Sequence, residues 1–313
     1  MKPMFRIASE QKVYRIGKVQ VGGQPGENPP VLIGSIFHKG DRLIRERREG
    51  RFDRERALSL LRQQEELSQQ TGIPAMLDIV ANSGEEFRAY IDFVAGATDA
   101  PFAIDAWKVG PKIEAARYAK EQGLLERLLY NSLTPWAEDI RGEVAALKEI
   151  GVKHLVIVAF DVGDKMPSGR LKSLAGLLTS VADLPLESLW VDTSTMNLPA
   201  QGFCALANRE IKERYGLPSG SAPANATYMW KEARKLWGVQ GFAAVDAAVH
   251  SLSALLWHDF LFYGPLQAAP RIFPAVAAAT SILATLAYAE TRMVPRDKDH
   301  PLPRFFADFS SQL

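Results

Sequence analysis

The sequence predicts an α/β protein, a single-domain (β/α)8 barrel, and two observations carry that prediction. Eight short runs of apolar, β-branched or aromatic residues alternate with longer segments of helical periodicity. Near-continuous apolar runs are typical of parallel strands that helices cover on both faces, and eight such units close naturally into a barrel. The length of 313 residues suits one barrel of this kind. The predicted strands are residues 31–37, 75–80, 102–106, 128–133, 155–160, 189–193, 219–222 and 260–263.

The segment before the first barrel strand predicts a β-hairpin. Residues 13–16 and 19–21 alternate around Gly17 and Lys18, which form a two-residue turn signal. We therefore divide the single domain into a hairpin and lead-in over residues 1–30, a barrel over 31–292 and a C-terminal tail over 293–313.

Helix boundaries are marked by capping residues. Asp53 precedes a predicted helix over residues 54–70, and Ser83 with Glu86 three residues later has the spacing of a capping box. An open, doubly wound sheet is the alternative architecture, but no strand is followed by the Gly-x-Gly-x-x-Gly string of a dinucleotide-binding fold. Glycines stand where four helices should end, at Gly72, Gly123, Gly151 and Gly216.

Composition excludes several classes of partner. The net charge of +1 argues against nucleic acid, which usually binds a basic face. The lone Cys204, in a helical pattern over 200–215, forms no intrachain disulfide, and the first 30 residues lack the apolar core of a signal peptide, so we expect a cytoplasmic protein. The Ala-rich segment 272–289 predicts a buried helix or a homodimer contact and no membrane span, because threonine and serine residues interrupt it.

Polar side chains end most of the predicted strands. The active sites of such barrels lie at the carboxyl ends of the strands, so these side chains are the candidate site. Single aspartates at strand ends are often only helix caps, and this reading competes equally for Asp78 and Asp161. Ser219 and Gly220, on the weak seventh strand, are further candidates. The strand-end side chains that form this candidate site are Asp78, Asp105, Asn131, Asp161, Asp192 and Asn225.

The chemistry of this set indicates a neutral heterocycle as ligand. Strand ends almost without Lys, Arg or His do not suit a phosphate ester, and the five histidines show no metal-ligand spacing, so we expect no protein-bound metal. A pterin ring suits carboxylates and carboxamides, because its 2-amino group and ring N–H give two parallel donors to one carboxylate.

Some of these residues lie in strings that resemble a known superfamily. The strings 104–106 (IDA), 130–132 (YNS) and 191–193 (VDT) resemble the pterin-binding barrels, which include dihydropteroate synthase and the methyltetrahydrofolate:corrinoid methyltransferases. A likeness over nearly the whole chain is to the H-subunit family of tetrahydromethanopterin S-methyltransferase. The strings that carry it are 22–27 (GGQPGE), 31–37 (VLIGSIF), 90–94 (YIDFV), 98–102 (TDAPF) and 263–266 (YGPL).

Within that family, the chain resembles the bacterial branch that transfers a methyl group from a methylated corrinoid protein to N5 of tetrahydrofolate in glycine betaine demethylation. It departs from the methanogen pattern in the loops 193–197 and 219–225. The resemblance implies that Asp105, Asn131 and Asp192 hold the pterin ring and that Asn225 lies near N5. Asn225 would assist by hydrogen bonding, and either Asp192 or Asp105 would manage the proton through water.

The resemblance also implies a partner and leaves alternatives open. The sequence has no Asp-x-His-x-x-Gly string, the usual corrinoid ligand motif, so a separate protein must supply the cobalamin, transiently. The loops after the first strand, 38–51, and after the fifth strand are candidate docking sites. The Arg-rich loop 38–51 is either a solvated surface or a region that steers an acidic partner or the glutamate tail of folate. One alternative is a tetrahydromethanopterin-dependent methyltransferase subunit, and another is a non-catalytic pterin-binding subunit of a corrinoid complex. A dihydropteroate-synthase-like enzyme is disfavoured because the seventh and eighth strands lack the expected basic residues.

Overall fold

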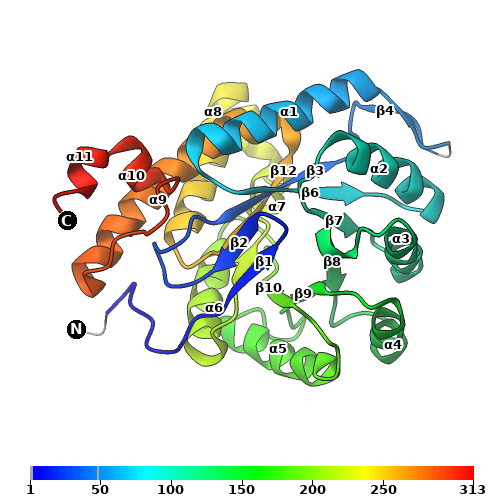
Figure 1. Cartoon of the computed structure of the whole chain (residues 1–313), viewed down its shortest axis with the longest axis horizontal. Coiled ribbons are helices and arrows are strands. Elements are labelled where there is room, and N and C mark those ends of the chain that lie inside the picture. The colour runs from blue at the N-terminus through cyan, green and yellow to red at the C-terminus, as the bar shows by residue number, and fades with distance from the viewer. Residues whose placement is uncertain (1–2, 48) are drawn as a thin grey trace.

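Eight parallel strands close into a barrel in the computed structural model, which describes residues 3–47 and 49–313 (Figure 1). Met1, Lys2 and Arg48, which fall in the predicted lead-in and first loop, lie outside the described residues. The strands are β3 (Val31–Ile36), β6 (Ala75–Val80), β7 (Phe102–Asp105), β8 (Leu128–Leu133), β9 (His154–Val158), β10 (Ser188–Asp192), β11 (Ser219–Ser221) and β12 (Phe260–Pro265). Their order around the barrel follows the chain, and β12 pairs with β3 to close it. The predicted fold is therefore confirmed, with strand ends that agree to within about two residues.

Helices surround the barrel. They are α1 (Arg54–Thr71), α2 (Gly84–Ala97), α3 (Val109–Glu121), α4 (Ile140–Ile150), α5 (Pro167–Val181), α6 (Ala200–Tyr215), α7 (Pro223–Met229), α8 (Lys231–Leu255), α9 (Ala269–Thr291), α10 (Pro301–Phe305) and α11 (Ala307–Ser310), with short 3-10 helices η1 (Leu125–Arg127) and η2 (Leu266–Ala268). Asp53 caps α1 by accepting a hydrogen bond from the Arg56 N–H, and Ser83 caps α2 through the Glu86 N–H, as the sequence predicts. Glu86 accepts from the backbone N–H of Asn82 at 3.0 Å, one residue before the position that a capping box would use.

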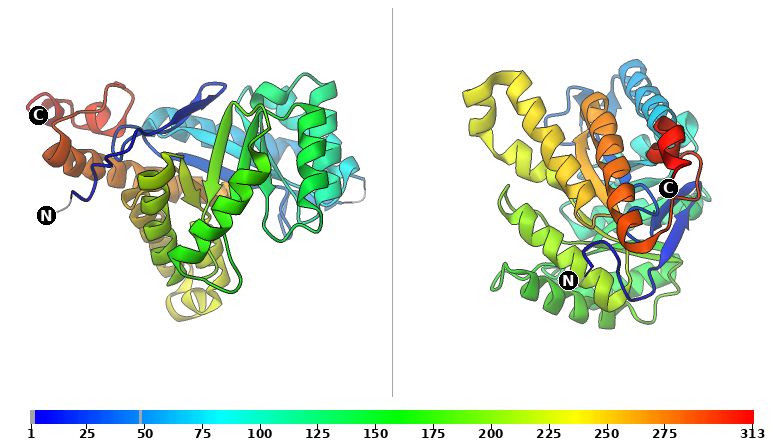
Figure 2. Two further views of the ribbon diagram at one scale, coloured as in Figure 1. Left: turned by 90° about the horizontal axis from the view of Figure 1, so that it is seen from below. Right: turned by 90° about the vertical axis from the view of Figure 1, so that its left-hand side faces the viewer.

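The predicted hairpin closes one end of the barrel. β1 (Val13–Ile16) and β2 (Val19–Gly22) pair around the turn at Gly17 and Lys18. Ile16, Val19 and Val21 belong to the same apolar cluster as the side chains inside the barrel. The turn lies against Pro101, the residue before β7, so the hairpin covers the amino ends of the strands. Figure 2 (left) shows the hairpin at one end of the molecule and the yellow helices α7 and α8 projecting at the other.

Two features were not predicted from the sequence. The loop after β3 contains a small antiparallel pair, β4 (Ile44–Glu46) and β5 (Arg51–Phe52). The connection from β11 to β12 holds both α7 and the long α8, whose two parts meet at a kink at Gly238 with φ of 65°. This φ is in the left-handed region that glycine adopts without strain.

The long apolar helix near the C-terminus belongs to the barrel shell. Residues 266–291 are long and apolar enough to span a membrane, but 56% of the apolar window is buried inside the molecule. Its helix, α9, packs against α1, α8 and α10. Ile272, Phe273 and Val276 are fully buried. This burial is typical of a core helix, so the segment is buried as predicted.

Candidate functional site

The side-chain alternation of the barrel strands places polar groups at one end of the interior. Met76, Ala103, Leu129 and Trp190 point into the barrel and form its apolar cluster. Side chains two residues further along a strand point to the same face. Those positions are Asp78, Asp105, Asn131 and Asp192. The strands therefore carry an apolar layer below and a polar layer at their carboxyl ends.

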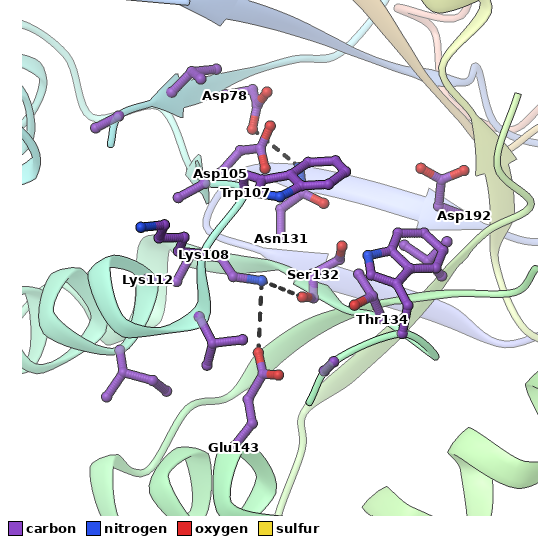
Figure 3. A pocket seen from close by; sticks show the side chains of 18 of the residues that line it. Asp78, Asp105, Trp107, Lys108, Lys112, Asn131, Ser132, Thr134, Glu143 and Asp192 are labelled. Carbon is purple, nitrogen blue, oxygen red and sulfur yellow. Dashed lines mark hydrogen bonds and ion pairs between the residues drawn. The ribbon is translucent and has the colours of Figure 1, made fainter. Parts of the chain in front are cut away.

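The polar layer forms the floor of a cavity of about 1260 Å³ (Figure 3). Its lining includes all four of these residues and also Asn225, so the structure brings together five of the predicted site residues. Asp105 and Asn131 are direct neighbours in the pairing of β7 with β8. The prediction that carboxylates and carboxamides crowd one end of the barrel is confirmed.

Asp78 is held at the bottom of the cavity. Its Oδ1 accepts a hydrogen bond from Asn131 Nδ2 at 3.2 Å, and its Oδ2 accepts from Ser35 Oγ at 3.2 Å. Burial, and next the Asp105 carboxylate, raise the pKa of Asp78 above its ordinary value. Asp78 is only 3% exposed and caps no helix, so its contacts exclude the helix-cap reading. It also orients the Asn131 amide.

Asp105 and Asp192 are the carboxylates that a ligand on the floor would meet. Burial raises the pKa of Asp105, and the Lys112 ammonium opposes that rise. Burial raises the pKa of Asp192 to about 6, against the opposing effect of a hydrogen bond from the Ser194 backbone N–H at 2.7 Å. Both groups can therefore exchange a proton near neutral pH, which suits general acid or base catalysis.

A buried lysine beside the floor was missed from the sequence. Lys112 Nζ lies 3.6 Å from Glu143 Oε1 and donates a hydrogen bond to the Ser132 carbonyl. Tyr130 donates to the same Glu143 oxygen at 2.7 Å. In sequence these groups lie within helical patterns and read as solvated charges, so only the packing of α3 against α4 reveals them. Lys112 corrects the expectation of a site nearly without cations, although Glu143 balances its charge.

Asn225 reaches the cavity from α7. It is exposed, lies in the first turn of that helix and lines the cavity. The helix is anchored from behind, because Thr227 Oγ1 donates to Asp246 Oδ1 at 2.6 Å. Arg271 Nε donates to the other oxygen of Asp246 at 2.8 Å, so α7, α8 and α9 meet at one buried carboxylate. This anchor fixes where Asn225 can lie.

Two tryptophans at the cavity rim were also missed. Trp107 is 91% exposed and Trp136 is 48% exposed, and both line the cavity. They stand in the loops after β7 and β8, the two strands that carry Asp105 and Asn131. Figure 3 shows the Trp107 indole standing over the polar floor. A tryptophan two residues after a strand-end aspartate was the signal in the sequence that could have identified the first of them.

Three candidates lie away from the cavity lining. Asp161 accepts from the Gly163 N–H at 2.8 Å and pairs with Lys172 at 3.6 Å, which is a loop-forming role. The Ser219 backbone N–H donates to Asp259 at 2.9 Å. At Gly220, a β-carbon would lie 2.2 Å from the Phe260 carbonyl oxygen, so glycine is needed for close packing of the strands.

Ion pairs hold arginine side chains of the Arg-rich loop 38–51 against neighbouring carboxylates. In the loop, Arg45 pairs with Asp53 at 2.8 Å and Arg47 with Glu86 at 3.2 Å.

One group among the described residues has ligand atoms close enough to share a metal ion, and it lies at the amino ends of the strands, opposite the cavity. Lys153 Nζ already pairs with both of its carboxylates, which is typical of surface ion pairing. The group is Glu126, His154 and Glu187.

Known proteins of the same shape include dihydropteroate synthases. The enzyme of Xanthomonas albilineans with 4-aminobenzoic acid superposes with a TM-score of 0.61 at 15% identity, covering 88% of this chain and 99% of that one. A dihydropteroate synthase of Yersinia pestis has a TM-score of 0.58 at 13% identity, covering 87% of this chain and 98% of that one. At such low identity the likeness shows the barrel fold alone.

Sequence relatives identify the family. A protein named as the H subunit of tetrahydromethanopterin S-methyltransferase from Methanopyrus kandleri is 33% identical over 93% of this chain and 96% of its own length. The H subunit of a putative methyltransferase, mtx, from Methanosarcina barkeri is 33% identical over 96% of this chain and 99% of its own. The family model described as tetrahydromethanopterin S-methyltransferase MtrH subunit matches residues 9–293. The predicted resemblance to this family is thereby confirmed, and this chain belongs to the MtrH family.

Proposed function

We propose that this protein transfers a methyl group between N5 of a tetrahydropterin and the cobalt of a corrinoid carried by a separate protein. The observation that carries the proposal is the set of Asp78, Asp105, Asn131 and Asp192, buried or half-buried on the cavity floor of an MtrH-family barrel. The corrinoid supplies a cobalt centre that takes up or releases the methyl group. The barrel supplies the pterin site and the proton.

The floor matches the polar edge of a pterin ring. In an ionised state, Asp105 accepts two parallel hydrogen bonds from the 2-amino group and the adjacent ring N–H. Asn131 offers its remaining amide hydrogen and its carbonyl oxygen to the neighbouring acceptor and donor, because Asp78 already fixes its amide nitrogen at 3.2 Å. Asp192, across the floor from Asp105 in Figure 3, then faces another part of the ligand.

The reaction needs a proton at N5. When the methyl group leaves N5, the C–N bond breaks, its electron pair stays on nitrogen and a proton comes in, which leaves a neutral N5–H amine. In the reverse transfer the lone pair of that N5–H amine takes the methyl group, and the N5 proton is released. With a pKa of about 6, Asp192 can give or take that proton through water. Asn225, at the opening, holds N5 by a hydrogen bond that strengthens as charge develops on nitrogen.

Two pterins are candidates. The names of the relatives favour tetrahydromethanopterin. Tetrahydrofolate, which the sequence resemblance favours, shares the same reacting ring, and the departures from the methanogen pattern in loops 193–197 and 219–225 speak for it. Because the polar floor faces only the ring, the choice between them depends on groups further out.

A non-catalytic pterin-binding subunit is the competing function, and turnover separates it from the enzyme. Methylcobalamin is mixed anaerobically with the protein and either tetrahydrofolate or tetrahydromethanopterin, and the visible spectrum is followed. We expect loss of the methyl-cobalt(III) band and growth of cobalt(I) with one of the pterins, and a slower change with Asn225→Ala. No change with either pterin, even with candidate corrinoid proteins present, would overturn the enzymatic proposal.

A further inference from the structure

We propose that Trp107, Trp136 and Lys108 form a second subsite, which binds the aryl and acidic tail of the pterin substrate. This inference rests on the proposed function, because it extends the same cavity. Both candidate pterins carry this chemistry, a phenyl ring attached through nitrogen to the pterin and a negatively charged group beyond it.

The cavity is larger than the ring site requires. Its volume of about 1260 Å³ exceeds the ~300–1,000 Å³ of usual small-molecule sites. The polar floor takes only one face of it, at the carboxyl ends of β6, β7, β8 and β10. The remaining wall rises along the loops after β7 and β8, where Trp107 and Trp136 stand. A ligand that fills the floor and extends along this wall meets the indoles next.

The two indoles are placed by neighbouring strands. Asp105 and Asn131 are paired across β7 and β8, and each is followed within five residues by one of the tryptophans. Both indoles are exposed, and aromatic rings pair favourably with one another in offset-stacked or edge-to-face arrangements. The tail of a pterin bound through Asp105 therefore passes directly by both indoles.

Charge indicates where the acidic end lies. Lys108 lines the cavity beside Trp107, is exposed and has no ion-pair partner among the described residues. Lys112, the other lining lysine, is already paired with Glu143. Glu138 lines the cavity near Trp136 and repels an anion. The acidic end is thus expected on the Lys108 side.

Comparison of a full and a truncated ligand tests the subsite. Anaerobic calorimetry measures the Kd of the full pterin that the wild type binds, tetrahydrofolate or tetrahydromethanopterin, and of 6-methyltetrahydropterin, which has only the ring. We expect Trp107→Ala and Trp136→Ala each to weaken the full pterin roughly fivefold and the ring-only ligand less than twofold. Lys108→Ala should weaken only the full pterin, with a difference that disappears at high salt.

Trp237→Ala is the matched control. Trp237 is 51% exposed on α8 and does not line the cavity, so its replacement should change neither Kd. Equal weakening of both ligands by the Trp107 and Trp136 variants, or no weakening of either, would overturn the subsite. So would unchanged pterin binding with slower transfer from a corrinoid protein, since the indoles would then contact that partner.

The two proposals fail in different ways. In one case the wild type binds the full pterin more tightly than the ring-only ligand, the tryptophan variants lose that difference, and no methyl group is transferred. This result supports the subsite and refutes the enzymatic function. A wild type that transfers methyl while its tryptophan variants bind both ligands normally refutes the subsite alone. Binding of neither ligand refutes both.

Discussion

The raised pKa of Asp192 has two opposing effects, because it lowers the stability of the folded protein at neutral pH and suits the side chain to proton transfer. Its position inside the barrel disfavours the charged form, which is why the pKa rises from 3.8 to about 6. The folded protein therefore holds this proton more tightly than the unfolded chain does. By linkage, that difference makes the side chain a cost to stability at neutral pH and a benefit to proton transfer.

Asp192→Asn should raise stability and remove activity. Between about pH 4 and pH 6 the folded wild type binds more protons than the unfolded chain, so its stability falls relative to the variant as pH rises. Above pH 6 the variant should be more stable by about 1–3 kcal/mol, a range reduced for partial exposure of the carboxyl group. Urea unfolding at pH 4 and pH 7.5 measures this difference. An equal difference at both pH values would contradict the assigned cause.

Asn225→Ala should act on rate and leave stability alone. The side chain is exposed, so its removal should change the free energy of unfolding by less than ~0.5 kcal/mol. Loss of a hydrogen bond to N5 should slow single-turnover methyl transfer by about 10- to 100-fold. Met229→Ala, in the same helix and 62% exposed, is the control and should keep the wild-type rate. A comparable loss in that control would mean that α7 itself had moved.

At the scale of elements, α7 depends on its neighbours for position. A helix of seven residues has little stability of its own in water. Its buried contact to Asp246, which Arg271 shares, supplies the anchor that the short helix lacks. Asn225 lies on the same short helix, so the contact that anchors α7 to Asp246 also fixes the position of Asn225.

Thr227→Val should loosen the attachment of α7 to Asp246 on α8. Valine has nearly the same shape but leaves Asp246 without one donor, which should cost about 1–3 kcal/mol. We expect faster amide hydrogen exchange in α7 and a several-fold lower kcat, with the Kd for pterin changed less than twofold. Thr280→Val is the matched control, since Thr280 is also fully buried but its hydroxyl has no partner among the described residues. If both variants behave alike, the bond to Asp246 does not position the helix.

The elements also show what the sequence could predict. Strands β3, β6 to β10 and β12 were found because each is a short, largely apolar run, whereas β11, Ser219–Ser221, gave only a weak signal. Helix α6 was predicted at its observed bounds because its periodicity and its closing glycine are local. The kinked α8 and the β4–β5 pair were missed because their conformation depends on packing against residues that are distant in the sequence. For the same reason the Lys112–Glu143 pair was missed, since a buried ion pair between two helices looks like two solvated charges in sequence.

On the scale of the whole molecule, ligand binding and folding are linked. A pterin that binds only the closed barrel should raise the free energy of unfolding by about 2.7 kcal/mol at one hundred times its Kd. Thermal unfolding with and without tetrahydropterin measures this, and Asp105→Ala should abolish the shift. Asp161→Ala should retain it, because Asp161 lies outside the cavity lining. The opposite pattern would relocate the pterin site.

The hairpin under the barrel has a kinetic consequence. Because β1 and β2 cover the amino ends of the strands, the pterin floor can be reached only from the carboxyl side. A corrinoid protein must occupy that same entrance to bring its cobalt within reach. The proposed reaction then has a compulsory order, in which pterin enters first and departs last. Excess partner protein should trap the pterin product, so steady-state turnover should pass through a maximum as the partner concentration rises.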